Sequence, residues 1–214
     1  MLTAQMLIKG HSESLERAIN SILPLDCAII VGNIGMSDDC KTICKKHKIK
    51  TIDLPWEKNF SKARNHLVTS DWNLWLEPWE IIASGHDEIK KPKQPNFYQV
   101  QCLSNNILTK ELRYWHGEAK FQNPIYEHID CKKPLDLDCV IYSSNAPNTN
   151  YEKLNIAQQW LSENPTRVEP QYYLALSFLA CRMYEQFINC ANQYLLKETN
   201  SISATMMNYY LAQV

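Results

Sequence analysis

The sequence lacks an excess of either charge, and it lacks an apolar run long enough to cross a membrane. Its 22 Lys and Arg residues balance 23 Asp and Glu residues, which argues against a basic nucleic-acid-binding surface spread over the whole chain. The longest apolar stretches, residues 27–31 and 174–180, are far shorter than the roughly 20 residues of a membrane-spanning helix. The N-terminus has no basic flank before an apolar run. We therefore expect a soluble, unsecreted, cytoplasmic protein with no membrane span and no nucleic-acid partner.

The composition is that of a folded protein. Hydrophobic residues make up 45% of the 214 residues and charged residues 21%, which is enough to bury the core of one medium domain that carries an appendage. Such a chain does not need a disulfide scaffold, so we expect its 8 cysteines to be reduced thiols. Cys40, Cys44 and His47 would share one helical face. No fourth metal ligand accompanies them, which favours a buried helix face over a zinc site.

The first quarter of the chain alternates strand-like and helix-like segments. Apolar runs typical of strands cover residues 2–8, 27–31 and 50–54, and helical periodicity covers residues 12–23 and 38–47. This β-α-β-α-β series predicts a layered α/β domain with parallel strands. Domains of this kind usually bind their ligand at the carboxyl ends of the strands.

Shorter helices and strands are expected next, before the sequence becomes helical throughout. We expect a helix over residues 60–68, a strand over 73–76, and antiparallel strands over 97–102 and 112–115. The run Asn-Ala-Pro-Asn-Thr-Asn at residues 145–150 predicts a domain boundary.

The C-terminal part has helical periodicity throughout. The expected helices cover residues 151–163, 170–182 and 184–197, with another beginning at residue 203. The alternation of large and small residues from Tyr172 to Leu195 resembles a tetratricopeptide repeat. We therefore expect an α/β domain over residues 1–145 and a helical, tetratricopeptide-like region over residues 151–214, which offers a surface for homo-oligomer formation.

Several segments, read in order, resemble a known enzyme family. Residues 7–10, 13–15 with 21–22, 29–38, 56–65 and 71–80 look like successive signatures of the family 2 glycosyltransferases. The most specific stretch is Trp-Glu-Lys-Asn-Phe-Ser-Lys-Ala-Arg-Asn at residues 56–65, which is similar to the Trp-x-x-Asp-Phe-Ser-x-Ala-Arg-Asn stretch of a bacterial and viral branch of that family. The resemblance implies a GT-A nucleotide-sugar fold, and a trailing tetratricopeptide-like region is frequent in this branch.

The resemblance also implies where a nucleoside-diphosphate sugar, a uridine one in this family, would bind. Asn33 and Asp38 would recognise the base and ribose, and Gly35 would allow a tight turn and close backbone approach. Arg64 carries a fixed fork of donors suited to a diphosphate, and Lys9 is a second cation. The plainer interpretation of this segment is a turn followed by a helix cap.

The metal motif of the family is altered in this chain. Relatives carry Asp-x-Asp, whose carboxylates hold magnesium or manganese against the leaving diphosphate. Here Glu77 stands at the first position and Trp79 at the second, and an indole does not ligate a hard cation. Two further acids of the family are amides here, Asn33 and Asn59.

Three interpretations of this altered position stay open at the level of sequence. Glu80 joins Glu77 as a ligand of Mn²⁺ or Mg²⁺, the cations Arg64 and Lys9 replace the metal, or catalysis has been lost.

An inverting transfer also needs a base that takes the proton of the acceptor as its nucleophile attacks the anomeric carbon. Residues 121–128 resemble the region in which relatives have a His-Glu pair near the acceptor. Glu127 is the candidate base, and His128 would replace it or orient its carboxylate, since histidine titrates near neutral pH. The alternative is an edge strand with a solvated Glu-His pair.

Aromatic residues raise the question of sugar stacking. Trp72 and Trp75 flank an expected strand and are assigned to the core, whereas Trp79 and Trp115 are expected on a ligand-binding face. Four tyrosines of the helical region are expected inside the repeat: Tyr172, Tyr173, Tyr184 and Tyr194.

The sequence thus predicts a glycosyltransferase that moves a sugar from a nucleoside-diphosphate donor to a protein, peptide or glycan acceptor with inversion. The alternative is a glycosyltransferase-derived binding or assembly module that has lost turnover and acts through its helical tail. The substitutions at Asn33, Asn59 and Trp79 favour this alternative.

Overall fold

The computed structural model describes residues 1–10, 12–91, 93–131, 133–143 and 147–214. Residue 145, where the sequence predicts the end of the α/β domain, lies outside these ranges. The chain divides into two compact units by its internal contacts. The first comprises Met1–Glu57, Ser61–Gln122 and His128–Pro147, and the second comprises Lys58–Phe60, Asn123–Glu127 and Asn148–Val214.

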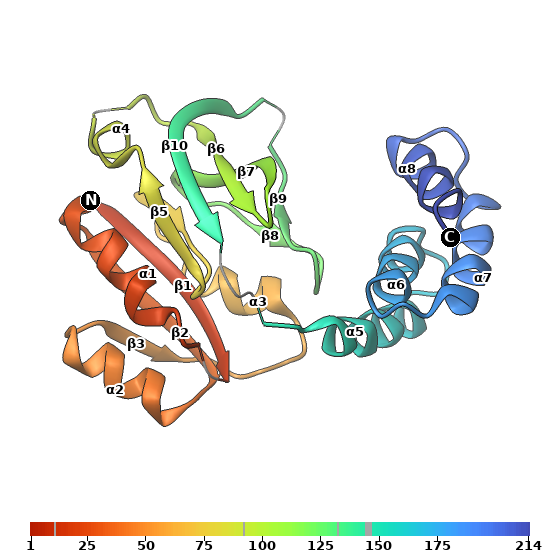
Figure 1. The fold of residues 1–214 in the computed structure, drawn as a ribbon, viewed down its shortest axis with the longest axis horizontal. Coiled ribbons are helices and arrows are strands. Elements are labelled where there is room, and N and C mark those ends of the chain that lie inside the picture. The colour runs from red at the N-terminus through yellow and green to blue at the C-terminus, as the bar shows by residue number, and fades with distance from the viewer. Residues whose placement is uncertain (11, 92, 132, 144–146) are drawn as a thin grey trace. The chain divides into compact units, whose positions relative to one another are not determined.

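An eight-stranded mixed sheet forms the centre of the first unit (Figure 1), with the strand order β3-β2-β1-β4-β7-β6-β10-β5. Strands β1 to β4 run parallel, β7 is antiparallel to both β4 and β6, β10 is parallel to β6, and β5 is antiparallel to β10. The strands are β1 (Leu2–Gly10), β2 (Ala28–Met36), β3 (Lys50–Asp53), β4 (Trp72–Trp75), β5 (Glu80–Ser84), β6 (Phe97–Ser104), β7 (Ile107–His116) and β10 (Leu135–Ser143). A separate two-stranded ladder joins β8 (Phe121–Gln122) to β9 (His128–Ile129).

One face of the sheet carries the main hydrophobic core. Successive residues of a strand point to opposite faces, and Ala4, Met6 and Ile8 of β1 join this core. Helices α1 (Leu15–Ile22), α2 (Asp38–Lys46) and α4 (His86–Lys90) cover it, with the 3₁₀ turn η1 (Leu23–Leu25) after α1. The helical residues in this core include Leu15, Ile19, Ile22, Cys40, Cys44 and Ile89.

The opposite face of the sheet is packed by different residues, and a glycine makes room for them. Gly32 of β2 lies beside three leucines, and a Cβ atom there would come within 3.0 Å of Leu7, Leu54 and Leu67. Helix α3 (Phe60–Asn65) precedes Leu67 in the chain, and its residue Ala63 is also buried.

The predicted alternation of strands and helices over the first quarter of the chain is confirmed, with one correction. The plainer interpretation of residues 33–38, a turn followed by a helix cap, is correct for the cap, because the Ser37 side chain accepts from Cys40 N, but β2 continues as far as Met36. The side chain of Asn33 accepts hydrogen bonds from the backbone N–H groups of Gly35 and Met36, which satisfies backbone donors that a turn would otherwise pair. Strands β5 and β10 and helix α4 were not predicted from the sequence.

The second unit contains four helices at the positions that the periodicity predicts. They are α5 (Asn150–Glu163), α6 (Glu169–Ala180), α7 (Tyr184–Leu195) and α8 (Ile202–Leu211) (Figure 1). Tyr173 stacks on Tyr126 and on Trp160, with ring centroids 5.6 and 5.8 Å apart, and Tyr172 packs against both Tyr173 and Tyr194. Three of the four tyrosines are therefore interior, as expected, whereas Tyr184 is 49% exposed.

The expectations on cysteines and on membrane-spanning helices can also be compared with the structure. All eight cysteines fall within the described ranges, and all are free thiols. Among the residues that the structure describes, no helix combines the length and the apolar character that crossing a bilayer would require.

Candidate functional site

The carboxyl ends of three parallel strands come together in the first unit. The chain passes from β1 to β2 and β3 on one side and then crosses to β4 on the other side of β1, which creates the kind of switch point where open α/β sheets bind ligands. The N–H of Ser37 donates to Gly10 O at 2.8 Å, and Ser12 Oγ donates to Pro78 O at 3.1 Å. These bonds join the segment after β1 to the segments after β2 and β4.

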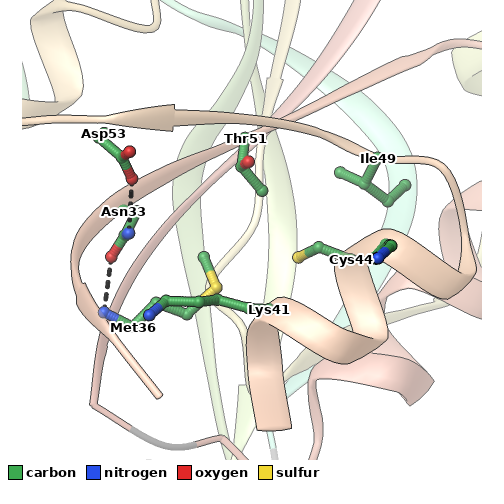
Figure 2. A pocket seen from close by; sticks show the side chains of 8 residues that line it. Asn33, Met36, Lys41, Cys44, Ile49, Thr51 and Asp53 are labelled. Carbon is green, nitrogen blue, oxygen red and sulfur yellow. Dashed lines mark hydrogen bonds between the residues drawn. The ribbon is translucent and has the colours of Figure 1, made fainter. Parts of the chain in front are cut away.

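Asn33 forms a small polar cradle at the end of β2 (Figure 2). Its Nδ2 donates to Asp53 Oδ1 at 2.6 Å, and its Oδ1 accepts from Gly35 N at 2.9 Å and from Met36 N at 2.6 Å. Gly35 has φ +119°, which an L side chain rarely adopts. The side chains of α2 face this cradle across a hollow of about 470 Å³, with Lys41 and Cys44 on the helical side (Figure 2).

Asp38 and Lys9 are two exposed charged residues near these strand ends. Asp38 pairs with Lys41, and Lys9 lies over Trp56. The Asp38 carboxylate is 95% exposed at the start of α2, where Lys41 Nζ donates to it at 2.9 Å. That contact holds the pKa of Asp38 below its ordinary value. Lys9 is exposed at the end of β1, and its Nζ lies 4.4 Å from the ring centre of Trp56.

Arg64 and Glu77 form a largely buried ion pair on the second face of the sheet. Arg64 Nη2 donates to Glu77 Oε1 at 2.7 Å, and the two side chains are only 11% and 14% exposed. Trp75 Nε1 donates to the same oxygen at 3.0 Å. The guanidinium also lies 4.0 Å from the ring centre of Trp75, so one tryptophan holds both partners of the pair.

The neighbouring Asn65 fixes the backbone beside this pair. Its Nδ2 donates to Phe121 O at 3.0 Å, and its Oδ1 accepts from Phe121 N at 2.8 Å. The Phe121 ring packs edge-on against Trp75 and Trp115 at 5.5 and 5.9 Å. The Arg-Asn dipeptide of the sequence motif therefore supplies one charged group and one backbone clamp.

Glu80 and Arg113 form a second ion pair next to the first. Arg113 Nη2 donates to Glu80 Oε1 at 2.8 Å and to Glu111 Oε2 at 2.7 Å. The other oxygen of Glu80 accepts from the backbone N–H of Glu77 at 2.8 Å. Glu80 and Arg113 are buried, with side chains 6% and 10% exposed. The two pairs are thus joined through the main chain of Glu77.

Burial and charge act against each other on these carboxyl groups. For Glu77, burial opposes the charged form, but the charges of Arg64 and Arg113 and the hydrogen bonds from Arg64 and Trp75 outweigh it and hold the pKa below its ordinary value. For Glu80, burial dominates over the attraction of Arg113, and the nearby Glu77 charge adds to it, so its pKa is raised. Arg113 stays protonated, because Glu80 and Glu111 raise its pKa in spite of burial.

The arrangement of these groups does not fit a divalent cation. Hard cations need several carboxylate or carbonyl oxygens that are free to converge. Here Glu77 binds a guanidinium and an indole N–H, and both oxygens of Glu80 accept hydrogen bonds from the chain. Within the described ranges, no group of three or more His, Cys, Asp or Glu side chains is placed to hold a metal.

The expected helix face of Cys40, Cys44 and His47 is engaged in other contacts. Cys40 and Cys44 are buried in the core, and Ser12 N donates to Cys40 Sγ at 3.3 Å. His47 Nε2 lies 3.0 Å from Glu16 Oε1. The buried helix face that the sequence favours is therefore what the structure shows.

The structure places three of the four tryptophans considered above in or against the interior, whereas the sequence predicts two there. Trp75 is 2% exposed and Trp72 packs against the core, as expected. Trp115 is wholly buried, so its placement on a ligand-binding face is wrong: it lies on β7 opposite Asn73 of β4 and is covered by Phe121. Trp79 is partly exposed in the segment between the two carboxylates.

The two candidate base residues belong to different units. Glu127 ends the 123–127 segment of the second unit and is partly buried, whereas His128 begins β9 of the first unit and is exposed. The geometry of the first unit therefore includes Arg64, Glu77 and Glu80 but not Glu127.

Comparison with known proteins places this fold. No protein-family model matches the sequence, and no curated protein matches it. A solved structure described as a mycobacterial protein aligns with a TM-score of 0.50 at 11% identity over 75% of this chain and 74% of its own. The fold is GT-A-like. The predicted α/β domain with a mixed sheet, followed by the C-terminal helices α5 to α8, is confirmed at this level.

Glucosyl-3-phosphoglycerate synthase from Mycobacterium tuberculosis also aligns with the chain. Its complex with phosphoglyceric acid gives a TM-score of 0.48 at 13% identity over 75% of this chain and 78% of the synthase. Its complex with Mn²⁺, uridine diphosphate and phosphoglyceric acid gives 0.38 at 14% identity. The second alignment covers 49% of this chain and spans only 43% of the synthase.

Three residues of the site were missed by reasoning from the sequence. Asp53 had a readable signal, because a carboxylate at the end of a predicted strand lies at the ligand-binding edge. Arg113 and the contact of Trp75 with the site had none, since their partners Glu80 and Arg64 come from other segments of the chain.

Proposed function

We propose that this protein is a glycosyltransferase that moves a sugar from a uridine-diphosphate donor to a protein, peptide or glycan acceptor, with inversion. The observation that supports it best is the meeting of the ends of β1, β2 and β4 in a GT-A-like sheet. Asn33 lies at the end of β2, and Arg64 binds Glu77 in the segment after β4. Glucosyl-3-phosphoglycerate synthase, a protein of similar fold, is described in complex with UDP-glucose.

In this proposal the donor binds across the carboxyl ends of β1, β2 and β4. Asn33 and Asp38 recognise the nucleoside, and Gly35 allows its close approach to the backbone. The hydrogen bond from Asn33 Nδ2 to Asp53 Oδ1 at 2.6 Å fixes the orientation of the Asn33 amide, with its NH₂ group toward Asp53. This polar edge suits a base or ribose hydroxyl, which both donates and accepts hydrogen bonds.

The diphosphate is bound by cations of the chain in this proposal. Arg64 meets the phosphates with its guanidinium fork, and Lys9 adds a second positive charge from the end of β1. Trp79 contributes an apolar surface beside them. The metal-ligand role of Glu77 and Glu80 is not carried forward, because both carboxylates bind arginines.

The transfer itself needs a base and an acceptor. As the acceptor nucleophile attacks the anomeric carbon, the bond from that carbon to the diphosphate oxygen breaks, and Glu127 takes the acceptor proton. His128 orients this carboxylate or replaces it. We further propose that residues 1–145 act as the donor domain and that the tetratricopeptide-like residues 151–214 bind the acceptor or a second copy of the chain.

One observation favours a second candidate, a binding module without turnover. Both oxygens of Glu80 are used, by Arg113 and by the backbone N–H of Glu77, and Glu77 Oε1 binds Arg64 and Trp75 at the position of the family's metal motif. Calorimetric titration with a panel of nucleotide sugars, followed by a hydrolysis assay, separates the two. Binding of a UDP-sugar with release of UDP supports the enzyme. Binding without release, or binding of no donor, supports the module, and binding of no donor also contradicts the donor-site assignment.

A further inference from the structure

Two arginines from separate elements neutralise the acidic segment that follows β4. Arg64 comes from α3 and Arg113 from β7, and they bind Glu77 and Glu80 at 2.7 and 2.8 Å. The resemblance implies a metal-binding Asp-x-Asp at this position. The positive charge there is instead part of the polypeptide.

The contacts of Glu77 and Glu80 oppose replacement of either arginine by a metal ion. Glu80 uses one oxygen for Arg113 and the other for the backbone of Glu77, so a cation would have to displace a bond that fixes the loop. Displacing either guanidinium would also leave a buried positive charge without its partner, next to the incoming cation. The donor set therefore selects against a divalent ion.

We infer that this site takes its nucleoside diphosphate without a divalent cation, with Arg64 as the cation beside the phosphates and Arg113 as the positioning residue behind it. The inference rests on the proposed function. Arg113 holds Glu80, Glu80 holds the backbone N–H of Glu77, and the Glu77 carboxylate holds Arg64. This chain of contacts fixes the guanidinium before any ligand arrives.

The geometry gives the Glu77 carboxylate a definite effect on ligand affinity. The Arg64–Glu77 pair keeps a small exposed area, 11% and 14% of the two side chains, so an anionic group approaches both charges together. A phosphate is attracted by the guanidinium and repelled by the carboxylate. Removing the charge of Glu77 while keeping its shape should strengthen phosphate binding, whereas removing a metal ligand would weaken it.

The substitution Glu77→Gln tests this difference in sign. Glutamine has the same shape, and its amide oxygen still accepts from Arg64 and Trp75. We expect UDP to bind this variant at least threefold more tightly than wild type in buffer with EDTA. We expect millimolar Mn²⁺ to change the affinity of either protein less than twofold. Weaker UDP binding by Glu77→Gln, with a loss of Mn²⁺ response, would overturn the inference.

A matched control is Asp136→Asn on β10. This carboxylate is also paired, with Lys110 at 2.8 Å and Gln99 at 2.7 Å, but it lies outside the site. Its UDP affinity should equal that of wild type. If it too binds UDP more tightly, the gain reflects the net charge of the protein and not the arginine pair, and the assignment of Arg64 fails.

The positioning role of Arg113 has its own test. Arg113→Lys keeps a cation beside Glu80, whereas Arg113→Met removes it. We expect the Met variant to lose at least fivefold in UDP affinity and the Lys variant to recover most of that loss, with both compared at a temperature where far-ultraviolet circular dichroism shows them folded. Equal affinity of the Met variant and wild type would remove Arg113 from the site.

Direct measurement of Mn²⁺ separates failure of this inference from failure of the proposed function. The electron paramagnetic resonance signal of free Mn²⁺ should fall no further with protein and UDP than with UDP alone. UDP binding that needs Mn²⁺ and disappears in EDTA would overturn the metal-free site and leave the proposed function standing. No UDP binding in either buffer would overturn the proposed function and the inference with it.

Discussion

Arg64 Nη2 donates to Glu77 Oε1 at 2.7 Å, and this bond ties helix α3 to the segment that follows β4. The bond joins two parts of the sequence that the family resemblance treats as separate motifs, one for phosphate and one for metal. In this chain they form a single charged unit on the face of Trp75.

Replacing Arg64 by alanine should weaken donor binding. The loss of a charged hydrogen bond to phosphate costs at least about 1.5 kcal/mol, which is a drop of about tenfold or more in affinity. Calorimetry with UDP measures it. Arg167→Ala is the control, since Arg167 lies in the second unit in an exposed pair with Glu169. Unchanged UDP affinity in Arg64→Ala would take Arg64 out of the donor site.

The Glu77 carboxyl should make stability depend on pH on the acid side. Its folded pKa is below the ordinary value, so its contribution to stability is complete above the unfolded pKa of about 4.3 and is lost as pH falls through the lower folded pKa. At pH 7 we expect Glu77→Gln to be less stable by about 1 to 3 kcal/mol. Urea unfolding of both proteins across this range should show the difference shrinking below about pH 4. A difference that stays constant would contradict the shift.

Gly85 should tolerate no side chain. It has φ +89°, and a Cβ atom there would lie 2.5 Å from Cys139 Cα and run into the carbonyl of Asp138. Gly117 offers the comparison, because it has φ +86° with open space around it. We expect Gly117→Ala to cost about 1 to 2 kcal/mol from backbone strain alone and Gly85→Ala to cost clearly more. Equal losses in thermal unfolding would mean that the contact with β10 relaxes freely.

Glu127→Gln should depress turnover and spare donor affinity, because a base acts on the acceptor and not on the nucleotide. A general base contributes roughly 10²- to 10⁴-fold to rate. Single-turnover transfer assays measure the effect, and UDP calorimetry verifies that the donor still binds. His128→Gln distinguishes the two candidates. If His128→Gln loses turnover and Glu127→Gln keeps it, the base is the histidine.

The aromatic stack of the second unit should carry much of its stability. Tyr173 contacts Tyr126, Trp160 and Tyr172, so Tyr173→Ala leaves a cavity that costs about 3 kcal/mol or more. Tyr184 is 49% exposed and its alanine variant should lose far less. Chemical denaturation monitored by helical circular dichroism tests the contrast, and similar losses would place the core of this unit elsewhere.

The sequence carried most of the information about the parallel half of the sheet. Apolar runs such as that of β2 are buried on both faces and stand out in composition. Strand β10 was missed although Leu137 and Cys139 alternate with Asp136 and Asp138, and Leu137, Cys139 and Ile141 are all buried. That alternation is a readable strand signal, and its interleaved aspartates obscured it.

The candidate site was less predictable, for a physical reason. On β7 the register with β6 shifts at Arg113, between Leu112 and Tyr114, so the alternation of side chains along a strand does not give the face of Arg113. Arg113 and Trp115 are both buried, and periodicity does not show what covers them. The covering groups, Phe121 and Glu80, come from distant segments, and no local pattern reports such a contact.

Hydrogen–deuterium exchange with and without UDP tests the central claim most directly, because it locates the ligand on the intact chain. The donor site proposed here predicts slower exchange at the ends of β1 and β2, over residues 33–38, and over the segment from Arg64 to Glu80. Exchange in α7 and α8 should not change. Protection confined to other segments, or no protection at a saturating UDP concentration, would contradict the claim that these strand ends bind a nucleoside diphosphate.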